Sequence, residues 1–312
     1  MKRITVIVPC FNEEEVLKLF YQEIKKYLVK DYEYNILFVN DGSRDNTFKV
    51  IMELQKEDKR IKYISFSKNF GKEAAMLAGL NGAKTLNSDA AIFIDADLQD
   101  PPSLIIQMLE QYEAGYKHIY AKHRKRIGEP ALKTFFAKMF YKVYSLITKD
   151  KNISKGARDF CLMDRAVIDA FLAIKDLNRF TKGIFSFVGF EKKYIEFDYI
   201  PRAAGKTKWS FKKLYKYAWM GIKQFSHVHL LIPRLLIFTS FLFLVFDTIF
   251  SIINKNFSYQ IMAFEILFVF VFIAIYVLVK LVYEVRDQGL NRPIYIIEDS
   301  NVYDERKNYK NI

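Results

Sequence analysis

The stretch "AAIFIDADLQDPP", residues 90–102, joins a short apolar run to three acidic residues and ends in two prolines. Residues 90–94 have the composition of a strand that is covered on both faces, as in a parallel sheet. Asp100, followed by Pro101 and Pro102, predicts an N-cap and the first turn of a helix. Asp95 and Asp97 then fall in the turn between strand and helix, where open α/β sheets bind ligands.

The chain before this stretch repeats the same alternation of strand and helix. Apolar strands are expected at "ITVIV" (4–8), "NILFVND" (35–41) and "IKYIS" (61–65), with helical periodicity at 13–29, 45–58 and 72–86. Such alternation is typical of a doubly wound α/β fold with a mostly parallel sheet and right-handed crossovers. The sequence therefore predicts an α/β domain whose ligand loops follow the strands.

The two acids of the turn have a spacing that suits metal binding. Asp95 and Asp97 are one residue apart, so both can hold one hard divalent cation while a diphosphate supplies further oxygens. Mg²⁺ and Mn²⁺ are the cations expected. The alternative is that both acids are solvated loop residues, which is the commoner role of an isolated D-x-D pair.

Charge and composition narrow the class of partner. The 48 basic and 35 acidic side chains give a net charge of +13, which suits nucleic acid, a membrane surface or a phosphorylated substrate, and an aromatic content of 16% favours lipid. No G-x-G-x-x-G occurs, and the "GKT" at 205–207 lacks the P-loop glycine, because Ile200 stands six residues before Lys206. A nucleotide site must therefore use another design.

The C-terminal third contains two apolar runs, 235–253 and 261–279, each close to the ~20 residues that span a bilayer as a helix. Lysine and arginine flank the pair on both sides, which predicts a two-helix transmembrane hairpin with both termini cytoplasmic. Asp247 and Glu265 within the runs favour an oligomer interface or solvation near the membrane interface. The basic amphipathic segments 132–147 and 211–225 suit a membrane interface, although an amphipathic helix more commonly packs on its own domain.

Four motifs follow the predicted strands: "VPCFNEE" (8–14), "VNDGSRDNT" (39–47), "NFGKEAA" (69–75) and "DADLQDPP" (95–102). Four more follow along the chain: "RDFCLMDR" (158–165), "NRFTKGIF" (178–185), "PRAAGKTKW" (201–209) and "NRPIYII" (291–297). Together they resemble glycosyltransferase family 2, and within it the polyprenyl-phosphate glycosyltransferases, which include bactoprenol glucosyltransferases and dolichyl-phosphate mannose synthase.

This resemblance implies a GT-A fold and an inverting transfer of one sugar from a nucleotide diphosphate to undecaprenyl or another polyprenyl phosphate at the cytoplasmic membrane face. UDP-glucose is the expected donor, with GDP-mannose, UDP-GlcNAc and modified sugars left open. The resemblance also implies the residues of the site. The nucleotide sugar is expected to contact Pro9, Asn12, Glu13, Asp41, Ser43, Gly71, Lys72, Asp95 and Gln99, and the metal to bind Asp95 and Asp97. Catalytic roles fall to Asp97, Asp159, Arg202 and Lys208, and the acceptor phosphate to Arg124, Lys133 and Lys138.

Simpler roles stay open for several of these residues. The Asp41–Ser43 turn also suits capping of the following helix. Lys72 could instead be a lysine exposed to solvent. Asp159 could instead form an ion pair with Arg158 or Arg165. Asp159 is expected to orient rather than to act as an obligatory base, since a phosphate monoester has its second pKa near 6 and is mostly dianionic at pH 7.

The expected organisation is a catalytic domain at 1–209, a juxtamembrane amphipathic helix at 210–229, transmembrane helices at 230–283 and a cytoplasmic tail at 284–312. This organisation predicts a multi-pass protein of the cytoplasmic membrane. Its expected partners are a nucleotide sugar, a lipid phosphate and a second copy of the chain, and binding of nucleic acid is not expected. Two other classes remain. A nucleotidyltransferase would not need the hairpin, and a non-catalytic scaffold would leave the strand-end motifs without a purpose.

Overall fold

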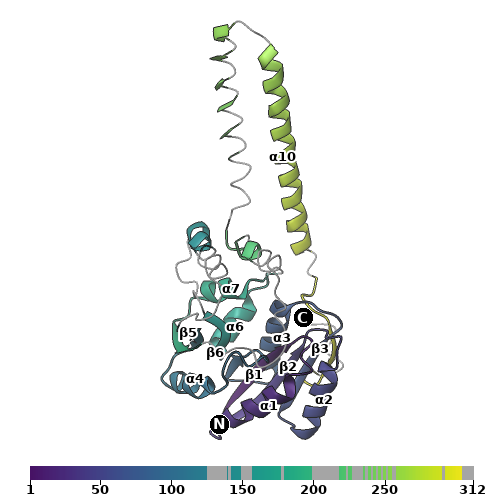
Figure 1. Cartoon of the computed structure of the whole chain (residues 1–312), viewed down its shortest axis with the longest axis vertical. Coiled ribbons are helices and arrows are strands. Elements are labelled where there is room, and N and C mark those ends of the chain that lie inside the picture. Colours follow the sequence, from purple (N-terminus) through teal and green to yellow (C-terminus); the bar gives the residue numbers. More distant parts are fainter. Residues whose placement is uncertain are drawn as a thin grey trace. The chain divides into compact units, whose positions relative to one another are not determined.

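The structure, a computed structural model, describes residues 1–124, 139, 142–148, 157–176, 179–198, 218–222, 224–226, 258–289 and 292–303, with short helical pieces between 235 and 254. The chain divides into two compact units. One combines Met1–Ala218 with Pro293–Ile312, and the other is Trp219–Arg292. The first unit contains the sheet and the candidate site (Figure 1).

The sheet of the first unit has eight strands in the order β7-β5-β6-β4-β1-β2-β3-β8. Their bounds are β1 Lys2–Cys10, β2 Tyr32–Asn40, β3 Ile61–Phe66, β4 Ala90–Phe93, β5 His118–His123, β6 Ala157–Asp164, β7 Lys192–Phe197 and β8 Ile297–Ser300. β1 pairs in parallel with β2 and β4, β2 with β3, and β5 with β7, whereas β6 and β8 run antiparallel to their neighbours. The expected Rossmann-like α/β domain of GT-A type, with a mostly parallel sheet, is confirmed.

The strand order reverses at β1. The chain proceeds from β1 to β2 and β3 on one side, and β4 then pairs with β1 on the other side. Such a switch point separates the loops at the carboxyl ends of the strands and leaves a crevice in which ligands bind. The loops after β1, β2 and β4 therefore surround the expected ligand position.

Helices cover both faces of this sheet. Their bounds are α1 Leu17–Ile24, α2 Thr47–Glu57, α3 Lys72–Thr85, α4 Leu104–Glu113, α6 Arg165–Ala173 and α7 Thr181–Val188, with a 3-10 turn, η1, at Lys25–Tyr27. Alternate β1 residues Ile4, Val6 and Val8 belong to the core that includes α1, α2 and α4. Ile7 faces α3, which passes so close that Gly79 has no room for a Cβ atom.

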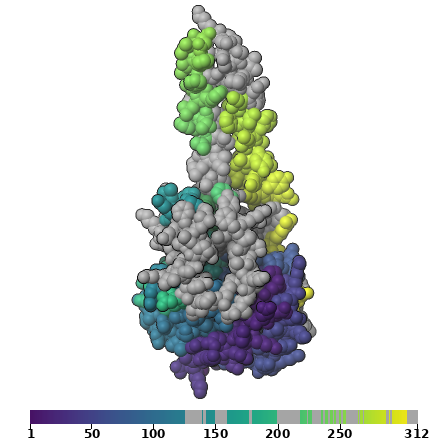
Figure 2. All heavy atoms as spheres, in the orientation of Figure 1, coloured from purple at the N-terminus to yellow at the C-terminus, as the bar shows by residue number. Residues whose placement is uncertain are grey.

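The N-terminal end of β1 is fastened to the end of α4. Lys2 Nζ lies 2.9 Å from a carboxylate oxygen of Glu113, and the Tyr32 hydroxyl donates to the same carboxylate at 2.7 Å. In the space-filling view the N-terminal residues (purple) meet the segment that contains α4 on one surface (Figure 2). Both contacts lie at the edge of the sheet opposite to the carboxyl ends of the parallel strands.

The predicted start of the helix after β4 is wrong by a few residues. Asp100 was expected as the N-cap, but the N-cap residue of α4 is Ser103. The reason is that Pro101 and Pro102 form a turn before the helix, in which the Leu104 N–H donates to Pro101 O at 3.1 Å and the Ile105 N–H to Pro102 O at 3.0 Å. Asp100 is buried, with 1% of its surface exposed.

The expectation of a multi-pass membrane protein is also wrong. In the part of the chain that the structure describes, no helix combines the length and the apolar character that a bilayer crossing needs. Such a crossing takes ~20 consecutive, predominantly apolar residues. The run 261–279 lies in α10, Ser258–Gly289, and much of the run 235–253 lies outside the described residues. The orientation expected for the termini depended on the hairpin and falls with it.

The outer strand β8 comes from the segment expected to form a tail. The Tyr63 N–H donates to Asn301 Oδ1 at 2.7 Å, and the Ser300 hydroxyl donates to Tyr63 O at 2.9 Å. Just before β8, the Tyr295 ring stacks on Phe66 with centroids 5.0 Å apart, and only 1% of Tyr295 is exposed. Residues 295–301 therefore complete both the sheet edge and the core beneath it.

Candidate active site

The loops after β1 and β2 are joined to each other by hydrogen bonds. The Asn12 N–H donates to Ser43 Oγ at 3.0 Å, and the Arg44 N–H returns a bond to Asn12 Oδ1 at 2.9 Å. Asn12 has a φ of 52°, in the left-handed region that asparagine tolerates. The Glu13 N–H donates to Thr47 Oγ1 at 2.7 Å. The structure thus brings Asn12, Glu13 and Ser43 together, next to half-buried Pro9 at the end of β1.

Asp41 connects β2 to the loop before α3. Its carboxylate accepts the Phe70 N–H at 2.7 Å, the Gly71 N–H at 3.0 Å and the Asn69 side-chain amide at 2.9 Å. Asp41 is 4% exposed, and this burial raises its pKa to about 6, although the N–H groups of Phe70 and Gly71 act in the opposite direction. Its carboxylate therefore positions Gly71 and the start of α3, whereas contact with a nucleotide stays a prediction.

Asp41→Asn should remove a pH dependence from the stability of the protein. Because the folded-state pKa of Asp41 is raised from its ordinary 3.8 to about 6, its contribution is fully present below pH 3.8 and is lost as the pH rises through 6. The amide cannot ionise, so the free energy of unfolding of the variant should rise relative to wild type by about 1–3 kcal/mol between pH 4 and 7. Urea unfolding of both proteins at pH 4 and pH 7 measures these free energies. A difference between variant and wild type that is the same at both pH values would contradict the prediction.

Gly42 is the point at which the β2 loop touches the next loop most closely. A Cβ atom there would lie 2.2 Å from the Lys68 carbonyl carbon, and the φ of Gly42 is +59°. Gly42→Ala should therefore destabilise the protein by about 2–4 kcal/mol, through the clash as well as the backbone strain.

Gly115→Ala is the matched control for Gly42→Ala. Gly115 also has a positive φ, +96°, but nothing lies within 4 Å of its Cβ position. Gly115→Ala should therefore lower the free energy of unfolding by only about 1 kcal/mol, through backbone strain alone. Equal losses for the two variants in thermal unfolding would show that the contact between Gly42 and Lys68 is not tight.

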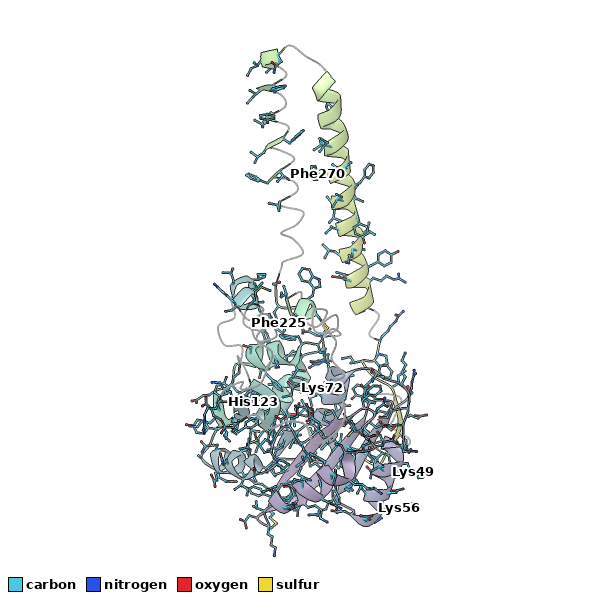
Figure 3. All side chains as sticks on the ribbon, viewed as in Figure 1. Lys49, Lys56, Lys72, His123, Phe225 and Phe270 are labelled. Carbon is cyan, nitrogen blue, oxygen red and sulfur yellow. The ribbon has the colours of Figure 1, made fainter. Side chains whose placement is uncertain are left out.

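Three charged side chains meet at the carboxyl end of β4. Lys72 is at the start of α3 (Figure 3). Its Nζ lies 2.8 Å from Asp95 Oδ1, 2.9 Å from Asp95 Oδ2 and 2.7 Å from Asp159 Oδ2. Burial lowers the pKa of Lys72, but the charges of Asp159 and Asp95 outweigh it and raise the pKa above its ordinary value. Lys72 is therefore charged and bridges two acids from separate strands.

Asp97 lies in a tight turn beside this cluster. Its Oδ1 accepts the Gln99 N–H at 3.1 Å, and Leu98 between them has a φ of 56°. An aspartate that bonds the backbone two residues later forms an Asx turn, and a left-handed leucine is a strained conformation of the kind that gathers at functional sites. Asp97 is 8% exposed. The turn fixes the direction of its carboxylate.

The acid pair fits a divalent cation only if a ligand supplies further donors. In the described ranges, no three or more His, Cys, Asp or Glu side chains come together as a metal cage. Mg²⁺ bound with nucleotides commonly takes one or two carboxylates, and phosphate oxygens and water complete its shell. Asp95 and Asp97 suit that kind of site.

Two residues without an assigned role link this region to α7, and one of them, Lys182, reaches the cluster. Lys182 Nζ lies 4.0 Å from Asp159 Oδ1. Glu73 Oε2 accepts the Thr181 N–H at 3.0 Å and the Thr181 hydroxyl, which ties the start of α3 to the start of α7. Glu73 belongs to the motif at 69–75 and Lys182 to the motif at 178–185. Neither motif contains a sequence pattern that predicts these contacts.

The acceptor-side residues are largely outside the described residues. Lys133, Lys138, Arg202 and Lys208 all fall there. Arg124 is exposed at the end of β5, where its N–H donates to Phe197 O at 2.9 Å and its Nη1 lies 3.8 Å from Asp198 Oδ2. The alternative ion pair of Asp159 with Arg165 is not formed: Arg165 pairs with Asp169 at 3.0 Å, and Asp159 pairs with Lys72. The Arg158 side chain lies outside the described part of the chain.

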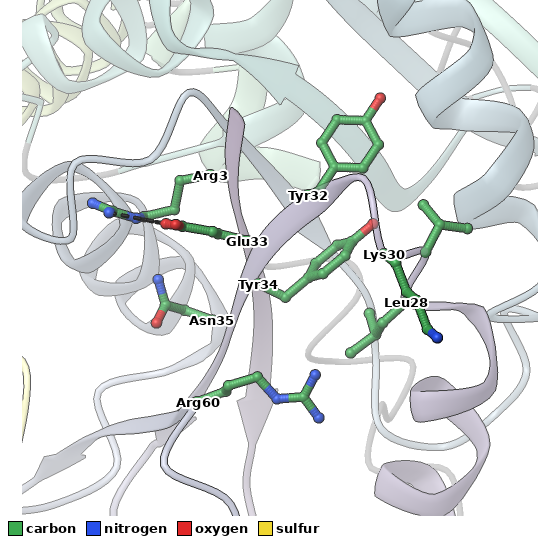
Figure 4. Close-up of a pocket in the computed structure, with 9 residues that line it drawn as sticks. Arg3, Leu28, Lys30, Tyr32, Glu33, Tyr34, Asn35 and Arg60 are labelled. Carbon is green, nitrogen blue, oxygen red and sulfur yellow. Dashed lines mark hydrogen bonds and ion pairs between the residues drawn. The ribbon is translucent and has the colours of Figure 1, made fainter. Parts of the chain in front are cut away.

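A cavity of about 360 Å³ lies away from this cluster (Figure 4). Its lining includes Arg3, Tyr32, Tyr34 and Arg60, at the amino ends of β1, β2 and β3. Because these strands are parallel, the cavity is at the opposite edge of the sheet from Asp95 and Asp97. None of the expected site residues lines it.

Comparison with known proteins identifies a family whose match includes the loops of the candidate site after β1, β2 and β4. The model of the family "Glycosyl transferase family 2" matches residues 5–172. The chain is 35% identical over 315 residues to the Bacillus subtilis (strain 168) protein named uncharacterized glycosyltransferase YkcC, with 98% of this chain and 96% of that protein covered. It is 40% identical over 225 residues to the prophage bactoprenol glucosyl transferase homolog of Escherichia coli (strain K12), and 39% identical over 225 residues to the bactoprenol glucosyl transferase of Shigella phage SfV, with 72% of each chain covered in both cases.

Proposed function

The chain belongs to glycosyl transferase family 2, and on that premise we propose that it transfers one sugar, with inversion, from a nucleotide diphosphate to a polyprenyl phosphate. UDP-glucose and undecaprenyl phosphate are the proposed pair, supported by the names of the bactoprenol relatives. The observation that carries the proposal is the group of Asp95, Asp97 and Asp159 with Lys72 at the switch point of the sheet.

The residues of the loops after β1 and β2 would hold the nucleoside. Asn12 and Ser43 form one hydrogen-bonded surface there, and Pro9 supplies an apolar face beside it. Asp95 and Asp97 would hold Mg²⁺ or Mn²⁺, which supplies positive charge against the diphosphate when it is bound. Gln99 and Gly71 border the same turn region and would complete the donor side.

The reaction needs little proton transfer. A phosphate oxygen of the acceptor attacks the anomeric carbon, and the bond from that carbon to the nucleotide diphosphate breaks with its electron pair on the leaving oxygen. Because the acceptor is mostly dianionic at pH 7, no base is required. Asp159, whose charge is balanced by Lys72 and Lys182, suits an orienting role. The donor diphosphate and the acceptor phosphate also need positive charge around them. We assign this role to Arg202 and Lys208, with Arg124, Lys133 and Lys138 on the acceptor side.

Product analysis tests this proposal. The purified protein is incubated with Mg²⁺, undecaprenyl phosphate and one of UDP-glucose, UDP-GlcNAc or GDP-mannose, each labelled in the sugar or in the nucleotide. Sugar label in the organic phase, with a lipid product one hexose heavier by mass spectrometry, is the expected result for UDP-glucose. Nucleotide label in that phase would instead identify a nucleotidyltransferase, and no label with any donor would contradict the proposal.

A further inference from the structure

Lys72 occupies the position between two acids that come from different parts of the chain. Asp95 follows β4, Asp159 lies on β6, and Lys72 opens α3, so their meeting depends on the folded sheet. Just under a third of each side chain is exposed: 28% for Lys72, 29% for Asp95 and 32% for Asp159. The cluster therefore stands at the surface of the site, where a ligand can reach it.

The contacts of Lys72 with Asp95 leave little room for a second cation on the same atoms. Its ammonium lies within 2.9 Å of both Asp95 oxygens. A divalent cation bound by Asp95 needs at least one of these oxygens, and two cations at such short distances from one carboxylate repel each other strongly. Binding of the metal through Asp95 therefore requires Lys72 to withdraw from it.

Withdrawal from Asp95 does not leave Lys72 without a partner. Its Nζ is 2.7 Å from Asp159 Oδ2, a contact that does not involve Asp95. Asp159 also has Lys182 Nζ at 4.0 Å, so its own charge stays balanced on a second side. Lys72 can thus pass from a position shared by two acids to one held by Asp159 alone.

We propose that Lys72 is the resident cation of the site: it neutralises Asp95 and Asp159 when no metal is bound, and gives up Asp95 when a divalent cation binds. Lys72 is then a positioning residue that competes with the metal, in addition to any contact with the donor. The inference rests on the proposed function in one respect, because it takes Asp95 as a metal ligand.

The test compares Lys72→Met with Lys84→Met, without donor or acceptor. Lys84 is the matched control, since it lies on the same helix and forms a similar ion pair, 2.7 Å from Asp169 Oδ1, at the opposite end. Removal of the competing ammonium should tighten Mn²⁺ binding by Lys72→Met about tenfold in calorimetry, because hydrogen bonds between charged groups no longer have to break. Lys84→Met and the charge-conserving Lys72→Arg should bind Mn²⁺ like wild type.

Thermal unfolding gives a second measurement on the same proteins. In EDTA, Lys72→Met should unfold at a lower temperature than Lys84→Met, because Asp95 loses its counter-charge and Asp159 loses the nearer of two lysines, and Mn²⁺ should restore most of the loss. Mn²⁺ affinity of Lys72→Met equal to or weaker than wild type, or a Mn²⁺ rescue no larger than that of Lys84→Met, would overturn the inference.

Wild-type protein provides a test that does not depend on the folding of a variant. Acetylation of lysines, followed by mass spectrometry, should show that Mn²⁺ increases the reactivity of Lys72 relative to Lys84, as Lys72 loses one of its two acidic partners. If Mn²⁺ left the ratio of Lys72 to Lys84 acetylation unchanged, that result would count against competition between Lys72 and the metal. These measurements contain no sugar transfer, so failure of the product analysis and failure of this inference are separate results.

Discussion

Asp97→Asn should lower the rate of sugar transfer by ~10²- to 10³-fold, the usual effect of losing one strong electrostatic contact to the charge that develops in a transition state. The amide keeps the size of the side chain and still offers an oxygen to the Gln99 N–H, so the Asx turn and the fold should persist. What is lost is the negative charge with which Asp97 would hold a divalent cation against the leaving diphosphate. The measurement is the initial rate of labelled sugar transfer at limiting Mg²⁺ or Mn²⁺.

Glu110→Gln is the control for this substitution. It makes the same chemical change in an exposed acid of α4, the helix that follows the turn, and should transfer sugar at the wild-type rate. Asp95→Asn should be as damaging as Asp97→Asn for transfer, with an added loss of stability because Lys72 loses a partner. A rate near wild type for Asp97→Asn, with limiting metal, would mean that these acids belong to the loop and not to the chemistry.

Tyr295→Ala should cost about 3–5 kcal/mol of stability, the range for truncation of a large buried aromatic side chain. The Tyr295 ring is stacked on Phe66 and its hydroxyl oxygen accepts a hydrogen bond from the Asn81 side chain at 3.1 Å. Removing the ring leaves a cavity between α3, β3 and the segment that leads into β8. Equilibrium unfolding in urea measures the loss.

Tyr295→Phe separates the ring from the hydroxyl. It keeps the stacking on Phe66 and loses only the acceptor for the Asn81 amide, which should cost about 1 kcal/mol. A loss below about 1 kcal/mol for Tyr295→Ala would show that the segment around β8 is not docked as described.

The central strands were predictable because each carries its signal locally. The apolar runs at 4–8, 35–41, 61–65 and 90–94 coincide with β1 to β4, whose side chains are covered on both faces and therefore read as continuous hydrophobic stretches. β8 has no such signal. Of its four residues only Ile297 is apolar and buried, and its place is set by pairing with β3, more than 200 residues earlier.

The site was predictable to the extent that its residues follow strands. Asp95 and Asp97 could be placed at one sheet edge from sequence, because the carboxyl ends of parallel strands meet there. The bridge from Lys72 to Asp95 and Asp159 could not, since it joins three elements whose distances only the tertiary fold sets. Lys182 escaped notice for the same reason: a lysine in the first turn of a helix has many uses, and only the packing of α7 brings it to Asp159.

The position of β8 has a consequence for how the protein is made. On the ribosome, Phe66 at the end of β3 is synthesised long before Ile297, its partner in β8. At roughly 5–20 residues per second, the outer edge of β3 waits about 10–50 s for that partner. An unpaired strand edge is a template for pairing with other chains. During translation the nascent sheet is therefore open to neighbouring nascent chains on this side, and chaperone binding to the β3 edge would protect it until β8 emerges.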